Sequence, residues 1–178
     1  MASIITATTT SGLTQSADNS GVLQLASGTG NLVTVPSVTG TAMVSGNMPA
    51  FSAYLAGYQN ITSGSYTKLT LDAEEFDTNN NFASSRFTPT VAGYYQLNAC
   101  VTAESLYNTI KISIYKNGGI HKTGFNVQTN ADQGSVSSLV YANGTTDYFE
   151  IYVFFGTTQT AYPSADGTYF NGCMVRSA

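Results

Sequence analysis

From residue 48 onward, apolar and polar residues alternate in short runs of the kind that form half-buried β-strands. Three runs, at 94–101, 110–115 and 148–155, show this period of two clearly. The alternation predicts one inward-facing set per run: Tyr95, Leu97, Ala99 and Val101; Ile110, Ile112 and Ile114; Phe149, Ile151, Val153 and Phe155.

Turn residues and the lack of helical periodicity extend this interpretation. Asn117, Gly118 and Gly119 follow the strand pattern at 110–115 and tolerate positive φ, which is typical of a β-hairpin turn. No stretch of about twelve or more residues shows a convincing helical period. Many short strands separated by regular turns predict an all-β protein, either a sandwich or a barrel.

The run at 148–155 differs from the others because both of its faces are mostly apolar or aromatic. Tyr148, Tyr152 and Phe154 share the second face, where a strand that covers only its own core is expected to be polar. Either a loop of the same chain covers this face, or another subunit does. Low charge favours another subunit, since only 9% of the residues are charged, against about 25% in a typical soluble domain.

The N-terminal part of the chain has a different composition. Residues 1–67 contain one charged side chain, Asp18, whereas the other fifteen lie between Lys68 and Arg176. Two strand-length pieces, 21–27 and 31–37, are bounded by turn residues and are too isolated to be stable in water by themselves. We interpret residues 1–48 as an extended N-terminal β-arm for assembly and anchoring, and residues 49–178 as a separate head.

Charge and hydropathy exclude several classes of partner. The formal net charge is −4, and the six Lys and Arg residues are scattered without a basic stripe, so nucleic-acid binding is not expected. The sequence contains no apolar run long enough to span a membrane, so we expect no membrane insertion. The N-terminus also lacks the charged and apolar segments of a secretory signal, which leads us to expect assembly in a cytoplasm.

The sequence offers little for catalysis. Its single histidine, His121, lies beside the hairpin turn and is expected to face solvent, without an orienting carboxylate and a nucleophile. The two cysteines, Cys100 and Cys173, are far apart along the chain, so with one histidine they exclude an ordinary zinc cluster. We therefore expect no enzymatic activity.

One acidic segment is a candidate metal site. Asp72, Glu74 and Asp77, followed by three asparagines, form an oxygen-rich stretch. Calcium prefers six to eight oxygen ligands, so a calcium site at these residues is one interpretation. An ordinary solvated acidic loop is the other, which the missing EF-hand spacing and glycine favour, and on that interpretation no cofactor is bound.

Tyrosine is abundant, with twelve residues, whereas tryptophan is absent. Tyrosine in surface loops suits polar, uncharged ligands such as sugars, because the ring face and the hydroxyl can both make contacts. Four tyrosines near turns are therefore candidate glycan-binding residues: Tyr58, Tyr66, Tyr107 and Tyr162. Packing in the core or in a subunit interface is the alternative for each.

The residues from Phe51 to the end resemble, in order, the motifs of the C1q-like and TNF-like family. FSAYLAG at 51–57 is similar to the opening strand, and FDTNNNFASSRFTPTVAGYYQLNACV at 76–101 resembles the Asn-rich loop, Arg-Phe-Thr strand and Gly-Tyr-Tyr strand. ISIYKNGG at 112–119 and TYFNGCMV at 168–175 resemble two later strands. The usual Gly-Asp turn before the penultimate strand is replaced by 143–147, and collagen-like Gly-X-Y repeats are absent.

The resemblance implies a jelly-roll sandwich that forms a homotrimer, with aromatic residues packed around the threefold axis. The residues expected at this trimer interface are Tyr95, Tyr148, Tyr152, Phe154 and Phe170. The resemblance also implies that the Gly-Tyr-Tyr strand lies beside the last strand, which would bring Cys100 close to Cys173. Both cysteines are nevertheless expected to stay reduced in a cytoplasm.

The segment 2–35 resembles the N-terminal regions of bacteriophage virion proteins, especially fibre and decoration proteins. The resulting hypothesis is a virion structural protein displayed on the particle surface, either a tail fibre that binds a receptor or a capsid decoration protein or head fibre. Residues 1–48 would bind other virion proteins, and the head would contact a host glycan or receptor.

Two other functions remain open from the sequence. A cellular C1q/TNF-like module that binds a ligand or glycan would require a secretion signal. An enzyme that degrades glycans on a fibre would require a pair of carboxylates held across a groove.

Overall fold

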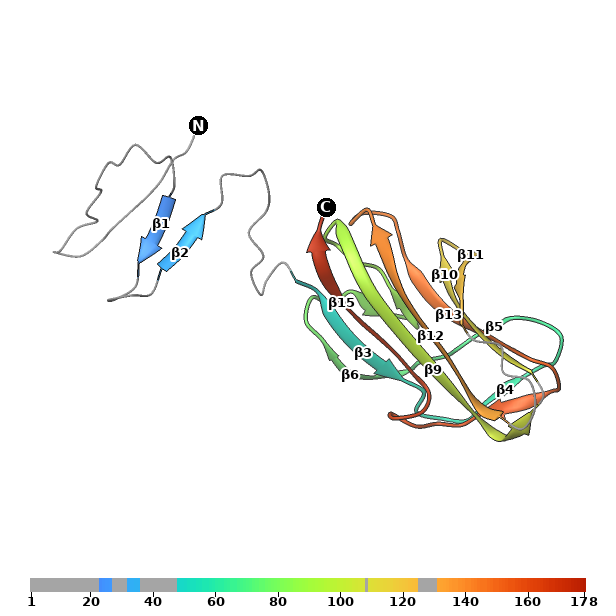
Figure 1. Ribbon diagram of the computed structural model, residues 1–178. Helices are drawn as coiled ribbons and strands as arrows, with labels where there is room; N and C mark the ends of the chain where they lie inside the picture. Colours follow the sequence, from blue (N-terminus) through green and yellow to red (C-terminus); the bar gives the residue numbers. More distant parts are fainter. Residues whose placement is uncertain (1–22, 27–31, 36–47, 108, 125–130) are drawn as a thin grey trace. The chain divides into compact units, whose positions relative to one another are not determined.

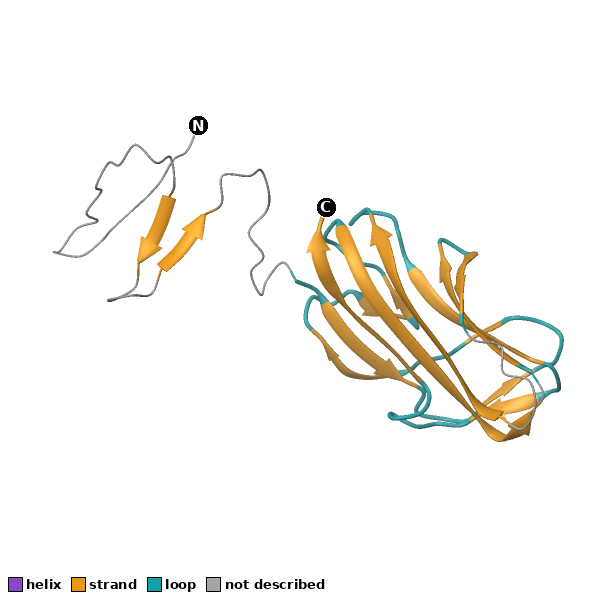
Figure 2. Ribbon diagram, in the orientation of Figure 1, coloured by secondary structure: helices purple, strands orange, loops and turns teal. Residues whose placement is uncertain are grey.

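The computed structural model describes residues 23–26, 32–35, 48–107, 109–124 and 131–178 of the 178-residue chain. The chain separates into two compact units, Met1–Thr41 and Ala42–Ala178. The expected boundary between arm and head, at 48/49, falls within the second unit. Figure 2 shows strands and connecting loops, with no helix in any described segment, which confirms the prediction of an all-β protein.

The described part of the first unit is a pair of short strands. β1 (Leu23–Ala26) and β2 (Leu32–Val35) pair antiparallel, with Leu23 opposite Val35 and Ala26 opposite Leu32. The two strand-length pieces expected at 21–27 and 31–37 are therefore confirmed as strands.

The second unit, which we call the head, is a sandwich of two antiparallel sheets (Figure 1). The first sheet, which we call the basic sheet for reasons given below, has the order β11-β10-β13-β8-β7, and β5 also pairs with β13. Its strands are β5 (Thr67–Lys68), β7 (Phe82–Ala83), β8 (Arg86–Phe87), β10 (Ile110–Lys116), β11 (Gly119–Thr123) and β13 (Phe149–Phe155).

The second sheet, which we call the acidic sheet, has the order β4-β14-β9-β15-β3-β6, and β12 pairs with β9. Its strands are β3 (Ala50–Tyr54), β4 (Gln59–Ile61), β6 (Ala73–Asp77), β9 (Gly93–Tyr107), β12 (Ala131–Ala142), β14 (Gln159–Ala161) and β15 (Tyr169–Ser177). The long strand β9 joins the sheet together, because β15 pairs with one of its edges and β12 with the other.

The core lies between the two sheets and consists of the side chains that the period of two placed inward. The predicted sets of β9, β10 and β13 are all buried, so these three assignments are confirmed. An aromatic cluster fills one region of the core. The Phe51 ring stacks on Phe87, with centroids 4.2 Å apart, and contacts Phe82 and Phe170 at 5.2 Å and 4.9 Å.

The turn between β10 and β11 is a two-residue hairpin turn. Asn117 and Gly118 both have positive φ, 54° and 83°, which is the backbone of a type I′ turn and matches the right-handed twist of the flanking strands. Asparagine and glycine are the residues that tolerate this conformation at least cost, so the Asn-Gly sequence explains the turn. The hairpin expected here is confirmed.

The two cysteines do not meet, although their strands are neighbours as the resemblance implied. Cys100 lies opposite Tyr169, and Cys173 lies opposite Gln96. The two cysteines are therefore offset by four residues along the paired strands β9 and β15. That offset corresponds to about 13 Å, beyond the Cα separation that a disulfide can bridge. Both thiols are free. The expectation that these cysteines lie close together is wrong.

The strands run between two distinct ends of the head (Figure 1). The chain enters β3 at one end, where the Pro49 carbonyl accepts a hydrogen bond from the Met174 N–H and the C-terminal Ala178 bonds to Ala92. β3 then leads to the opposite end, where the loops after β3 and β14 lie. We call these the proximal and the distal end.

The aromatic cluster predicts a large effect of Phe51→Ala on stability. Removing this buried ring should lower the free energy of unfolding by about 3–5 kcal/mol, since it leaves a cavity against which Phe82, Phe87 and Phe170 no longer pack. Urea denaturation measures the change. Phe76→Ala is the matched control, because Phe76 is 50% exposed, and it should change stability by less than about 0.5 kcal/mol. Equal effects of the two substitutions would contradict this packing.

Candidate ligand-binding and assembly surfaces

Two of the four candidate glycan-binding tyrosines meet at the distal end. Tyr58 lies in the loop after β3 and Tyr162 directly follows β14. Their rings are 5.5 Å apart at 90°, and the two residues are 61% and 43% exposed. Desolvation, and then the nearby Tyr162 and Glu104, raise the pKa of Tyr58. The loops thus present two adjacent aromatic rings to solvent. We call them the distal pair.

The side of the basic sheet that faces away from the core is aromatic. The tyrosines Tyr115 on β10 and Tyr152 on β13 stack in parallel at 3.9 Å, and Tyr66, just before β5, contacts Tyr115 and Phe154. Each of these rings is half-buried by its neighbours. We call this row the aromatic strip, and its residues are Tyr66, Tyr115, Tyr148, Tyr152 and Phe154.

A carboxylate with two cationic partners lies within the aromatic strip. Glu150 Oε1 accepts hydrogen bonds from Lys68 Nζ at 2.7 Å and from Arg86 Nε at 2.9 Å, and Arg86 Nη2 is 2.8 Å away. The Arg86 guanidinium also lies 3.9 Å from the ring centroid of Tyr148. Burial raises the pKa of Glu150, but the two cations outweigh burial and lower it, so Glu150 is ionised at neutral pH.

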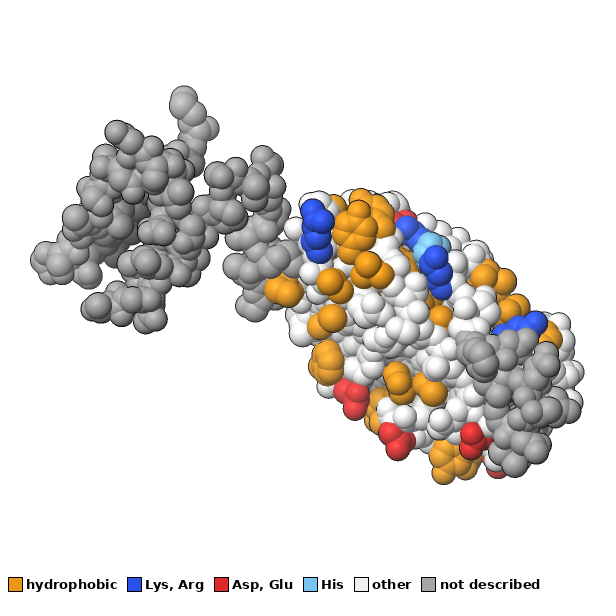
Figure 3. Space-filling model, viewed as in Figure 1, with side chains coloured by type: hydrophobic (Ala, Val, Ile, Leu, Met, Phe, Trp, Pro, Cys, Tyr) orange, Lys and Arg blue, Asp and Glu red, His pale blue; other side chains and the backbone are white. Residues whose placement is uncertain are grey.

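The outward side of the acidic sheet carries apolar side chains at its proximal end. Tyr94 and Tyr141 contact each other with ring centroids 5.5 Å apart, and Leu139 and Val175 are 53% and 56% exposed. Figure 3 shows hydrophobic side chains gathered over the ends of β15, β9 and β12. We call Tyr94, Leu139, Tyr141 and Val175 the apolar patch.

A row of polar side chains continues from the apolar patch towards the distal end. Gln96 Nε2 donates to Ser137 Oγ at 2.9 Å, and Ser137 donates in turn to Asn98 Oδ1 at 2.8 Å. Asn98 Nδ2 then donates to Asn171 Oδ1 at 3.2 Å. The row links β12, β9 and β15, so these strands offer a preorganised polar surface next to an apolar one.

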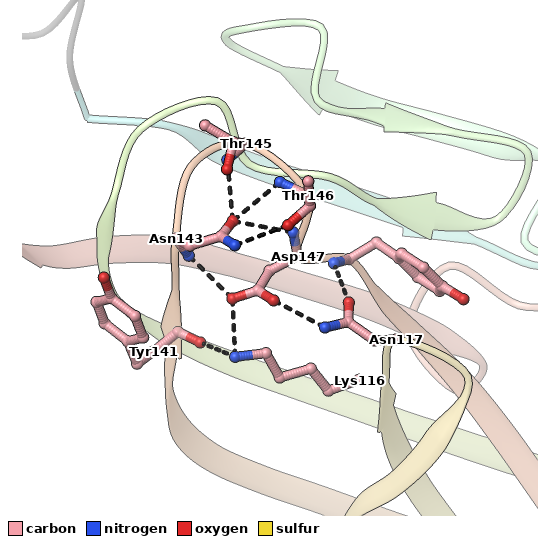
Figure 4. Close-up of polar contacts among 8 residues, drawn as sticks. Lys116, Asn117, Tyr141, Asn143, Thr145, Thr146 and Asp147 are labelled. Atoms are coloured by element: carbon pink, nitrogen blue, oxygen red, sulfur yellow. Dashed lines mark hydrogen bonds and ion pairs between the residues drawn. The ribbon is translucent and has the colours of Figure 1, made fainter.

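The loop between β12 and β13 is held by a dense set of hydrogen bonds (Figure 4). Asn143 Oδ1 accepts the backbone N–H groups of Thr145, Thr146 and Asp147 at 2.9–3.0 Å, and thereby closes the turn. Gly144, with φ 72°, lies so close to Ala92 that a Cβ atom would approach its nitrogen to 2.4 Å. The replacement for the family's Gly-Asp turn is therefore a loop closed by one asparagine side chain.

Asp147 joins this loop to the β10–β11 hairpin. Its carboxylate accepts from Asn117 Nδ2 at 2.8 Å and from the Asn143 N–H at 2.9 Å, and it pairs with Lys116 Nζ at 2.8 Å. Burial raises the pKa of Asp147, but the hydrogen bonds from Lys116, Asn117 and Asn143 outweigh burial and lower it. The ionised carboxylate thus fastens two turns at the proximal end.

The acidic segment does not form a cluster. Asp72 Oδ1 accepts the Ala56 N–H, and the two oxygens of Asp77 accept the N–H groups of Asn79 and Phe82. Glu74 is exposed on β6. Within the described residues, no group of three or more His, Cys, Asp or Glu side chains is arranged to hold a metal ion. Asp72 and Asp77 cap backbone groups instead.

The remaining predicted residues are dispersed. Tyr95 and Phe170 lie in the core of the head itself, where packing within one chain accounts for their burial. Tyr107 ends β9, and its side chain lies outside the described residues. His121 is exposed on β11, as expected; burial and the neighbouring Lys122 lower its pKa. The described segments contain no helix that is long and apolar enough to cross a membrane.

Sequence reasoning missed the apolar patch. Tyr94 shares the outward face of its strand with the polar residues Gln96 and Asn98, so the sequence showed no sign of an apolar surface there. Its contact with Tyr141 depends on the β9–β12 register, in which the two residues lie opposite each other. The segment 136–142 has apolar residues at both even and odd positions, so both faces of a strand formed by it carry apolar side chains. Leu139 and Tyr141, on the face opposite to Val140, are the signal that could have revealed the patch.

Comparison with known proteins identifies the fold of the head. The globular domain of zebrafish complement 1qA protein matches with a TM-score of 0.55 and 15% identity, over 73% of this chain and 98% of that one. Murine APRIL matches with a TM-score of 0.56 and 9% identity, over 72% and 99%. PRD1 vertex protein P5 matches with a TM-score of 0.50 and 14% identity, over 92% and 86%.

No protein-family model matches the sequence, and no curated protein matches it either. The structural matches nevertheless agree with the order of motifs read from the sequence. The head has the C1q/TNF-like jelly-roll fold, as the resemblance implied.

The Asp147 contacts predict a pH-dependent loss of stability in Asp147→Ala. At pH 7 this variant should be less stable by about 2 kcal/mol, because Lys116, Asn117 and the Asn143 N–H lose their acceptor. The pKa of Asp147 is depressed in the folded state, so its contribution is present above the unfolded pKa of about 3.9 and is lost as the pH falls further. The difference between wild type and variant should therefore shrink below about pH 4.

Thermal unfolding at a series of pH values measures this dependence. Asp132→Ala is the control, because Asp132 is exposed on β12, and it should leave stability nearly unchanged. A deficit in Asp147→Ala that stays constant down to pH 2 would contradict the role of the ionised carboxylate.

Proposed function

We propose that this chain is a non-enzymatic structural protein of a bacteriophage virion, displayed on the particle surface as a homotrimer. In this proposal residues 1–48 anchor the protein to other virion proteins, and the head points away from the particle. Tail-fibre or receptor-binding and capsid-decoration or head-fibre roles both fit this arrangement. Assembly takes place in the host cytoplasm.

The observation that carries the proposal is the extent of the match to the vertex protein P5 of phage PRD1. The C1q and APRIL matches cover 73% and 72% of this chain, which is about the share that the head represents. The PRD1 match covers 92% of this chain and 86% of P5, so it extends into the residues before the head. A similarity to a phage vertex protein that continues beyond the head supports a virion role for the whole chain.

The composition of the arm supports an anchoring role. Asp18 is the one charged residue in the first 48, which suits burial against other proteins better than exposure to water. β1 and β2 pair with each other and, among the described residues, with no further strand. Each therefore has an edge that can add to a sheet of another virion protein.

The apolar patch supports association of the head with further copies of itself. Leu139, Val175, Tyr94 and Tyr141 are 40–56% exposed on one sheet, and such grouped apolar side chains mark protein–protein contacts. The adjoining polar row offers amide groups that can pair across an interface and fix its register. Trimerisation through this side would leave the aromatic strip and the distal pair accessible.

The distal pair is the surface that we expect to bind a host receptor or glycan. Tyr58 and Tyr162 lie at the end of the head opposite to the point where the chain enters it. A head anchored through its N-terminal side presents this distal end outward. Two exposed tyrosine rings provide both stacking surfaces and hydroxyl groups for a sugar.

A second candidate function is a cellular C1q/TNF-like module that binds a ligand or glycan, which the matches to complement 1qA and APRIL favour. The two functions differ in the role of residues 1–48. A cellular module requires no attachment of these residues to a particle, so the arm distinguishes the two proposals.

The proposed trimer predicts that a charge in the apolar patch disrupts assembly. Leu139→Asp should convert a trimer of about three times 18.7 kDa into monomers, because an unpaired carboxylate is costly to bury in an interface. Light scattering with size-exclusion chromatography measures the mass. Ile120→Asp is the matched control, because Ile120 is 56% exposed on the other sheet, and it should remain trimeric.

A wild-type protein that is monomeric at micromolar concentration would refute the trimer. A trimer that tolerates Leu139→Asp would place the interface elsewhere, with Tyr148, Tyr152 and Phe154 of the aromatic strip as the next residues to test.

The anchoring role predicts that deletion of residues 1–46 separates folding from incorporation. The described core of the head begins at Phe51, so the truncated protein should stay folded, with a melting temperature close to that of the full chain. Particles assembled with the truncated protein in place of the full chain should lack it on an immunoblot. Full-length protein expressed in the same way is the control. Normal incorporation of the truncated head would argue against the anchor, whereas absence of the full-length protein from particles would favour the cellular module.

A further inference from the structure

The two sheets of the head carry opposite charges. Strands of the basic sheet contain five of the six Lys and Arg residues and one carboxylate, namely Lys68, Arg86, Lys111, Lys116, Lys122 and Glu150. Strands of the acidic sheet contain one cation and five carboxylates, namely Arg176, Glu74, Glu75, Asp77, Glu104 and Asp132. A protein of net charge −4 therefore has one strongly cationic sheet.

The cations of this sheet flank the aromatic strip. Arg86 and Lys68 form ion pairs with Glu150. Lys111 lies opposite Phe154 in the β10–β13 register, and its Nζ is 5.2 Å from the Phe154 ring centroid. Four residues along β13 separate Glu150 from Phe154, which corresponds to about 13 Å. The strip thus has a positive group at two separated points, with aromatic rings between them.

Arg86 is held in place yet has donors left for a ligand. Its Nε and one Nη2 hydrogen are directed at Glu150, and Tyr148 supports the plane of the guanidinium. An arginine has five N–H donors, so three remain, and the side chain is 43% exposed. A guanidinium fixed in this way is preorganised to bind a second carboxylate through its free edge.

Lys111 provides the second cationic contact. Within the described residues its Nζ makes no ion pair or hydrogen bond, whereas Lys68 and Lys116 are paired with Glu150 and Asp147. Its charge is therefore available to a ligand that extends along the strip from Arg86.

We propose that the aromatic strip, with Arg86 and Lys111 at its two cationic points, binds a carboxylate-bearing polysaccharide. Sugar rings would pack against the tyrosine and phenylalanine rings, and carboxylates of the chain would pair with Arg86 and Lys111. This proposal deepens the proposed host-attachment role and rests on it for its biological meaning, while the binding itself is a property of the purified protein.

The spacing of the cations favours a polysaccharide over a nucleic acid. Each strand of a DNA duplex carries one phosphate per about 3.4 Å of helix axis, whereas the two cationic points are about 13 Å apart. The chain as a whole is also acidic, so it repels a dense polyanion. A polysaccharide with sparse carboxylates matches both the separation of the cations and the rings between them.

Titration calorimetry of the full chain with a hyaluronan oligosaccharide, which carries one carboxylate per disaccharide, tests the proposal. Wild type should bind this carboxylate-bearing sugar chain, and binding should weaken as sodium chloride screens the charges. A neutral dextran oligosaccharide and an oligothymidylate are the comparison ligands. Neither should bind with comparable affinity.

The substitutions separate ligand contacts from folding. Arg86→Gln should weaken binding strongly, but it also removes a partner of Glu150, so Lys111→Gln is the more informative variant. Lys111→Gln should weaken binding of the hyaluronan oligosaccharide by about tenfold, because a charge-assisted contact is lost. Lys122→Gln removes the same charge from the same sheet away from the strip, and it should bind like wild type.

Absence of binding to the hyaluronan oligosaccharide would overturn the proposal, as would equal affinities of Lys111→Gln and Lys122→Gln. Tighter binding of the oligothymidylate would replace the polysaccharide with a nucleic acid. The molecular mass of Lys111→Gln is measured in parallel, and a change of oligomeric state would identify the strip as an interface between copies of the chain. These outcomes do not depend on whether particles incorporate the protein, so failure of the proposed function is separately visible.

Discussion

Packing of the inward side chains of one sheet against those of the other is the interaction on which the rest of the head depends. The cluster around Phe51 brings together rings from β3, β7, β8 and β15, and these strands belong to both sheets. Because the side-chain period of a strand is two, fixing the inward set also fixes which residues face outward. Both outward surfaces, the apolar patch and the aromatic strip, follow from this single constraint.

The sequence was a good guide wherever burial alone decides the structure. Alternation in 94–101, 110–115 and 148–155 correctly located β9, β10 and β13 and their buried faces, and Asn117-Gly118 correctly located a hairpin turn. These features are local, because one strand's pattern or one turn's φ angles suffice to determine them. The order of motifs was enough to indicate the jelly-roll fold.

Surface sites were less predictable because they depend on register between distant strands. The six cations look scattered in the sequence, yet the topology places five of them on one sheet. Tyr58 and Tyr162 are separated by more than half of the chain, yet their rings are in contact. Conversely, the expectation that Cys100 lies close to Cys173 was wrong, because residues on neighbouring strands need not lie opposite each other. A four-residue offset separates the two cysteines.

The two outward surfaces differ in a way that fits the different partners proposed for them. Apolar side chains of the patch, such as Leu139 and Val175, stand largely free of neighbours, so their contact area is available to a protein surface that excludes water. Rings of the strip already stack on one another, and Arg86 is already fixed by Glu150 and Tyr148. A surface that is rigid before binding loses little conformational entropy when a ligand arrives, which suits a flexible polar chain better than a second folded subunit. The proposed trimer contacts on the acidic sheet and the proposed ligand contacts on the basic sheet can therefore coexist, since the core separates the two surfaces within each head.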